Sequence, residues 1–151
     1  MNFPVALMLA ALILGAIGLG GGLYEATLID RAWPRLPQLI QPKRGGIDRK
    51  LFWIPMHTAY ELALAGALWA NWHAPFARYC TAIALAAHAI TRAWSFLHFI
   101  PAALRFEEAG DLPPTQTAAA LAWTRRSRWR IAIEAGAVAT LALAVGGGIY
   151  S

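Results

Sequence analysis

Long apolar runs constrain the fold of this chain more than any other feature. Four runs, at residues 3–28, 51–72, 76–100 and 131–150, approach the roughly 20 residues with which a helix crosses about 30 Å of hydrocarbon. None of them alternates like a strand of a membrane barrel. The chain is also 58% hydrophobic and only 14% charged, unlike an average soluble domain. The sequence therefore predicts an all-α membrane protein in which residues 1–151 form one four-helix transmembrane bundle.

The first apolar run has a competing interpretation, a cleaved signal peptide. The run has no basic segment before it and no clear A-x-A cleavage site, and it stays apolar beyond the usual length of a signal peptide. We therefore expect it to persist as a membrane helix.

Lysine and arginine are shared unevenly between the connections. The segment 29–50 has four arginines and two lysines and the segment 101–130 has five arginines, whereas the turn after the second helix has only Arg78. Basic connections stay on the cytoplasmic side, so we expect a multi-pass protein of the cell inner membrane with both termini outside. The net charge of +5 then reflects contact with anionic head groups of the lipid bilayer and not with nucleic acid.

Prolines and glycines predict how the two connections are built. In the segment 29–50 they favour an irregular path along the membrane surface, with Trp33 and Leu36 dipping into the interface. In the later connection Pro114 predicts the start of a helix. Residues 117–126 then either begin a long fourth helix or form a short interfacial one.

Glycines in the first apolar run are spaced for close helix contacts. Gly18 and Gly22 lie four residues apart, and the last run also repeats Ala and Gly. Such faces fit packing within one chain as well as packing between copies in a homo-oligomer.

Ionisable side chains occur inside the apolar runs. His57 and Glu61 lie four residues apart and share a helix face. Counting about 1.5 Å per residue from the cytoplasmic ends places Glu25, Arg92 and His98 in the same half of the membrane. An isolated charge in hydrocarbon costs at least about 2.5 to 3.5 kcal/mol, so these groups should face one another around one polar cavity. Glu61 is the predicted partner of Arg92, and Glu25 is the next candidate.

Two chemical interpretations of this cluster remain open. In the first, His57, Glu61 and Glu25, with His98 or His88, bind iron, copper or zinc. In the second, no metal or other cofactor is required, and the same groups act as acid and base on an apolar substrate that enters from the bilayer. Arg92 would then hold a developing oxyanion.

A third interpretation is structural. The carboxylates would pair with arginines and histidines only to fix the bundle, as in a non-enzymatic membrane subunit or scaffold. Arg130 and Glu134 fit this best, because an i, i+4 pair near the membrane boundary can reach the interface without any function.

Three stretches resemble small four-helix membrane proteins of the anthrone-oxygenase-like group: "GGGLYEATLIDRAWP", "LFWIPMHTAYELA" and "FIPAALRFEE". That group has an aromatic–acid pair at the end of helix one, a Trp near a proline, and an F-[IV]-P turn after helix three. The matching positions here are Tyr24, Glu25, Trp33 and the turn at 99–101, and the approach to helix four matches at Trp123, Arg126, Trp129 and Arg130. The resemblance implies oxidation of polycyclic phenolic anthrones by dioxygen without a tightly bound cofactor.

These observations define the candidate site. We expect an oxygenase-like enzyme or a binder for an apolar aromatic small molecule, with a non-enzymatic scaffold as the alternative. The candidate catalytic residues are Glu61, His57 and Arg92. The candidate substrate-binding residues are Tyr24, Glu25, Trp94 and His98.

Overall fold

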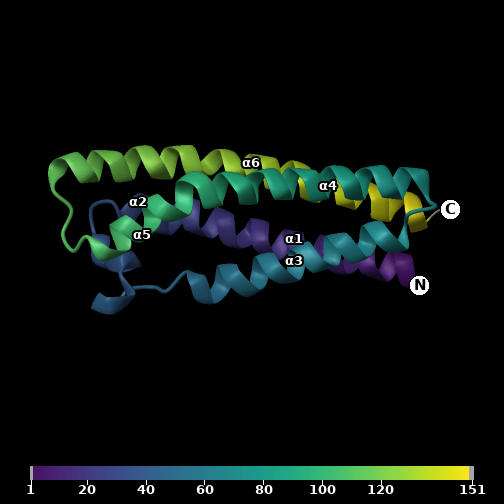
Figure 1. Cartoon of the computed structure of the whole chain (residues 1–151), viewed down its shortest axis with the longest axis horizontal. Coiled ribbons are helices and arrows are strands. Elements are labelled where there is room, and N and C mark those ends of the chain that lie inside the picture. Colours follow the sequence, from purple (N-terminus) through teal and green to yellow (C-terminus); the bar gives the residue numbers. More distant parts are fainter. Residues whose placement is uncertain (1, 150–151) are drawn as a thin grey trace.

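The computed structural model describes residues 2–149, and every regular element in that range is helical. Four long helices, α1 (Phe3–Tyr24), α3 (Lys50–Ala70), α4 (Pro75–Trp94) and α6 (Pro114–Ile149), lie side by side as a bundle (Figure 1). The two ends of the chain and the α3–α4 turn lie at one end of the bundle, and both longer connections lie at the other. The predicted all-α class is confirmed.

The helices pack in a ring. α1 packs along α3 and α6, α4 packs along α6 and less extensively along α3, and α1 and α4 are therefore diagonal to each other. Three helical segments, Phe3–Ala32, Pro75–Glu108 and Pro114–Gly147, are long and apolar enough to cross a membrane. α3 is not among them, because His57 and Glu61 lower its mean hydropathy.

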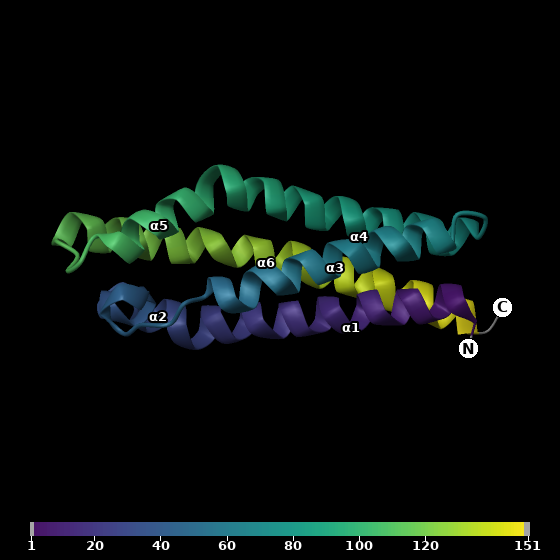
Figure 2. The same cartoon turned by 60° about the horizontal axis from the view of Figure 1, so that its bottom comes forward.

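Two of these segments contain a π-helical turn. The turn η1 (Glu25–Ile29) joins α1 to α2 (Asp30–Ala32), and η4 (Ser95–Phe99) joins α4 to α5 (Ile100–Glu108). A π turn inserts an extra residue and bends the helix, and Figure 2 shows the bend between α4 and α5.

The expected turn at residues 99–101 and the expected connection at 101–130 are wrong. Pro101 lacks an N–H group and would clash with the carbonyl four residues earlier. The π turn before it relieves that conflict, so the helix continues to Glu108. Pro114 then starts α6, whose Ala-rich first turns favour helix. Residues 117–126 thus belong to a long fourth helix, whose expected end at Tyr150 lies outside the described residues.

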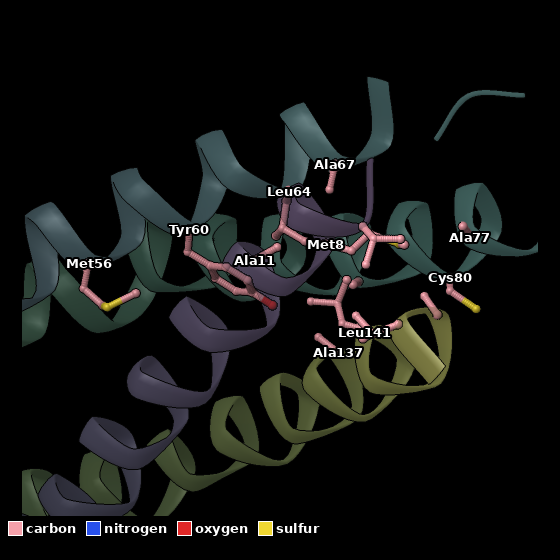
Figure 3. Packing of buried hydrophobic residues seen from close by; sticks show 14 residues of the cluster. Met8, Ala11, Met56, Tyr60, Leu64, Ala67, Ala77, Cys80, Ala137 and Leu141 are labelled. Atoms are coloured by element: carbon pink, nitrogen blue, oxygen red, sulfur yellow. The ribbon is translucent and has the colours of Figure 1, made fainter. Parts of the chain in front are cut away.

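The half of the bundle that holds the termini has a solid apolar core. Met8 and Ala11 of α1, Leu64 of α3 and Leu141 of α6 meet between the helices (Figure 3) and are almost completely buried. Small residues allow this close approach. A Cβ atom at Gly15, for example, would lie 3.0 Å from the Tyr60 ring.

A second, smaller core lies at the opposite end, under the α1–α3 connection. Trp33 is fully buried there and packs on Phe106 and Trp123, with ring centroids 5.3 and 5.8 Å away. Its indole N–H donates to Asp30 at 2.9 Å. The expectation that Trp33 dips into the interface is therefore wrong, because the indole finds both aromatic contacts and an acceptor inside the protein. Leu36 is exposed, and its insertion into the interface stays a prediction.

The connection itself is folded and not irregular throughout. It contains two short 3₁₀ helices, η2 (Pro37–Ile40) and η3 (Pro42–Arg44). The buried side-chain amide of Gln41 donates to the carbonyls of Phe106 and Gly110 at 3.0 and 2.6 Å. These bonds attach the connection to the end of α5.

This packing predicts that Gly46→Ala destabilises the protein. A Cβ atom at Gly46 would lie 2.1 Å from the carbonyl oxygen of Gln38. Relieving such an overlap typically costs about 1 to 3 kcal/mol, so the melting temperature in detergent should fall. Gly20→Ala is the control, because a Cβ atom there meets nothing within 4 Å. Equal melting of Gly46→Ala and wild type would mean that the connection is not folded as described.

Candidate functional site

A cavity of about 760 Å³ lies in the half of the bundle opposite the solid core. All four helices contribute to its walls, and its volume lies within the roughly 300–1,000 Å³ of small-molecule sites. Tyr60 and His88 lie at its inner end, next to the solid core, and Lys50 and Glu107 lie at its outer end. Trp53 and other aromatic side chains line the space between them.

Three side chains at the inner end form a chain of titratable groups. His88 is 1% exposed, and its Nδ1 lies 2.8 Å from Oε1 of Glu134 on α6. The Thr91 hydroxyl donates to the same carboxylate oxygen. On the other side of the ring, Nε2 of His88 lies 3.6 Å from Oε1 of Glu61. At that distance Nε2 has no hydrogen-bond partner. A buried imidazole thus lies between two carboxylates on different helices and is bonded to Glu134 alone of the two.

The predicted contact between Arg92 and Glu61 is confirmed. Nε of Arg92 donates to Oε1 of Glu61 at 3.1 Å, and the guanidinium lies 4.5 Å from the centroid of the Phe96 ring. The Glu61 side chain is 45% exposed, whereas that of Arg92 is 19% exposed. Glu61 is therefore the member of the chain that a bound molecule can reach most easily.

His57 and Glu25 also line the cavity. The Trp53 indole N–H donates to Glu25 at 2.9 Å, and its ring stacks on His57 with centroids 5.2 Å apart. His57 in turn lies 5.4 Å from the His88 ring. Glu25 begins the π turn η1, so the irregular part of the first helix carries one of the polar groups of the site.

The expected pair between Arg130 and Glu134 is wrong. Glu134 is bonded to His88 and Thr91, and Arg130 donates to the hydroxyls of Ser95 and Ser127 at 2.8 and 2.6 Å. Helical spacing places Arg130 and Glu134 on one face, but competing partners on α4 and η4 take both side chains. The Arg130 guanidinium also lies 4.1 Å from the Phe99 ring centroid.

An ion-pair cluster closes the outer end of the cavity. Arg49 and Lys50, at the start of α3, lie 3.0 and 3.3 Å from the Glu107 carboxylate of α5. The side chains of Arg49 and Glu107 are only 10% and 9% exposed. Sequence reasoning missed this cluster, because Glu107 was assigned to a loop. The available signal was the helical spacing of apolar and charged residues in 100–108, which fits the helix α5.

Three candidate substrate-binding residues lie away from the cavity. Tyr24 and His98 are exposed on the outer surface. Trp94 packs on the Phe99 ring at 5.2 Å and does not line the cavity. Of that set, the structure brings only Glu25 into the site.

The residues at 2–149 contain no group of three or more His, Cys, Asp and Glu side chains arranged to hold a metal ion. His88 already bonds Glu134 through Nδ1, and Glu61 bonds Arg92.

Comparison of the chain with protein families, with curated proteins and with solved structures found no match. Function is therefore inferred from the cavity and from the side chains that line it.

A double-mutant cycle tests the central ion pair. Arg92→Leu and Glu61→Leu should each lower the free energy of unfolding, because each leaves one charge without its partner. Glu61 is partly exposed, so we expect a coupling of about 1 to 3 kcal/mol, less than for a fully buried pair. The measurement is chemical unfolding in detergent.

The control cycle combines Glu61→Leu with Arg126→Leu, because Arg126 is exposed on α6. It should show additive losses. Additive losses in the Arg92 cycle as well would contradict the pair.

Proposed function

We propose that this chain is a multi-pass membrane protein that binds an apolar aromatic small molecule in its cavity and acts on it as an oxygenase-like enzyme. The main support is the chain from Glu61 through His88 to Glu134, which begins on the wall of a cavity of about 760 Å³. Such a chain can take a proton from a bound molecule and store it away from water.

Helix lengths and charges support the membrane setting. α6 has 36 residues and is about 54 Å long, which exceeds the roughly 30 Å of hydrocarbon in a bilayer. Its first half, with the exposed Arg125, Arg126 and Arg128, extends beyond the apolar part. Because basic segments stay on the cytoplasmic side, the end with the second core faces the cytoplasm, and both termini lie outside.

Thiol labelling in intact cells tests this orientation. Cys80 is the one cysteine of the sequence and is replaced first by Ala. On this background, Ala74→Cys in the α3–α4 turn should react with an impermeant thiol reagent, and Lys43→Cys should react only after the cells are opened. Both positions are exposed. Lys43 is used because a side chain at Gly46 would overlap the backbone. Labelling of Lys43→Cys alone in intact cells would reverse the orientation.

Aromatic side chains support an aromatic ligand. Trp53 of α3, Phe96 and Phe99 of η4, and Trp123 of α6 line the cavity. Flat rings stack or pack edge to face with a planar ligand, which adds about 0.5 to 1.5 kcal/mol per ring pair beyond burial alone.

The chemistry begins with a proton transfer. Glu61 accepts a proton from an acidic C–H or O–H group of the ligand and passes it to Nε2 of His88, 3.6 Å away, while the proton on Nδ1 moves to Glu134. Arg92 stabilises the negative charge that develops beside it. In a phenolic anthrone, dioxygen then converts the ring CH₂ group to a carbonyl. Both C–H bonds break, one oxygen atom forms the C=O group, and the other leaves as water with both hydrogens. The resemblance to anthrone-oxygenase-like proteins supports this choice of reaction.

Oxygen uptake with 1,8-dihydroxyanthrone in lipid nanodiscs tests the reaction. The wild-type protein should consume one O₂ for each quinone carbonyl formed. Glu61→Gln should retain binding but lower kcat about 10²-fold or more, the usual loss for a general base. The control is Leu62→Gln, on the exposed face of α3. Failure of the anthrone to bind would reject the proposed function.

A structural scaffold is the second candidate, and one observation favours it. The charged groups of the cavity largely satisfy one another, as in the pairs Arg92–Glu61, Arg49–Glu107 and His88–Glu134. In a scaffold, no aromatic ligand raises the melting temperature of the wild type or of Glu61→Gln. In an enzyme or binder, the ligand raises the melting temperature of both wild type and Glu61→Gln.

A further inference from the structure

The cavity is open on one side, between α3 and the bent α4–α5 segment. Figures 1 and 2 both show α3 diverging from this segment toward the end that carries α5. Several residues that line the cavity on this side are also exposed to solvent. They are Ile54 and Thr58 of α3, Phe96 of η4 and Leu104 of α5.

The end of the bundle, in contrast, is closed. Arg49, Lys50 and Glu107 join α3 to α5 across it. The second core, with Trp33 fully buried, fills the space beyond the cavity. A ligand that came from the aqueous end would have to break these contacts, whereas the side opening needs no such change.

Polarity falls from the inner end of the cavity toward the side opening, whereas the outer end carries the charged side chains of Arg49, Lys50 and Glu107. Glu61, Arg92 and His88 gather at the inner end, while Ile54, Phe96 and Leu104 surround the opening. On α3, the residues that line the cavity extend from Lys50 to Glu61, over about 16 Å of helix. A molecule with a polar head and an apolar tail matches this arrangement.

We infer that the ligand is a membrane-dissolved phenol with an alkyl or isoprenoid tail, and that it enters sideways from the bilayer. The phenolic head lies against Glu61 and Arg92, and the tail leaves through the opening between Thr58 and Phe96 into the lipid. The inference rests on the proposed function, because it assumes that the cavity binds an aromatic molecule within a membrane. A tail that remains in lipid loses no contact with apolar surroundings, so the opening tolerates any length of tail.

Two resorcinols in lipid nanodiscs test the route of the tail. 5-Methylresorcinol and 5-pentadecylresorcinol share one head group, and quenching of tryptophan fluorescence gives each Kd as a mole fraction of lipid. Both should bind the wild-type protein. Thr58→Phe should weaken binding of the long-tailed compound about tenfold or more, which corresponds to the usual cost of overfilling a packed space. Binding of the methyl compound should change less than about threefold.

Ala103→Phe repeats the test from the opposite wall, because Ala103 lines the cavity on α5. Thr58 suits substitution, since its hydroxyl donates to the Ile54 carbonyl within the same helix. Leu62→Phe is the matched control. Leu62 is 69% exposed on α3 and lies outside the cavity wall, so neither resorcinol should bind this variant differently.

Equal losses for both resorcinols in Thr58→Phe and Ala103→Phe, or no loss for the long-tailed one, would overturn the inference. So would failure of both to bind the wild type while 1,8-dihydroxyanthrone still binds, and in that case the proposed function stands. If the anthrone and both resorcinols fail to bind, the proposed function falls together with the inference.

Discussion

A charged group inside an apolar bundle must find a partner, and this constraint organises half of the molecule. The partners lie on different helices: Arg92 of α4 bonds Glu61 of α3, His88 of α4 bonds Glu134 of α6, and Trp53 of α3 bonds Glu25 of η1. Leaving a buried charge unpaired is strongly destabilising, so these contacts fix how the helices are aligned around the cavity. In the other half, apolar packing joins the same helices, together with one bond from the Asn71 side-chain amide to the Pro4 carbonyl.

The sequence predicted the helices and one ion pair because both follow from simple counts. The apolar runs are as long as a membrane is thick, and depth along each helix brings Arg92 to the level of Glu61. The same counts could not find the first half of α6. That half carries Arg125, Arg126 and Arg128, and a helix outside hydrocarbon has no reason to be apolar. Likewise Trp33 looked like an interfacial anchor, because nothing in the sequence shows the aromatic cluster that buries it.

The candidate site was predictable only in part. Glu61, His57, Arg92 and Glu25 line the cavity because each lies on the inward face of a helix at a similar depth. The role of His88 required knowledge of which side chain α6 presents to it, and periodicity along one helix cannot supply that. The π turns are equally invisible as local patterns.

Two helical segments that are each interrupted by a π turn pack on either side of one uninterrupted helix in this bundle. α6 is continuous over 36 residues and packs against both α1 and α4. The α1–α2 segment contains the π turn η1 and the α4–α5 segment contains η4, and both turns lie beside the cavity. When a π turn moves along a helix by one residue, the residue that it passes rotates by about 100° around the axis, while the residues farther away keep their places. An unbroken helix has no comparable freedom. α6 is thus the rigid helix of the bundle, and any change in the shape of the cavity comes from the two segments that contain a π turn, α1–α2 and α4–α5.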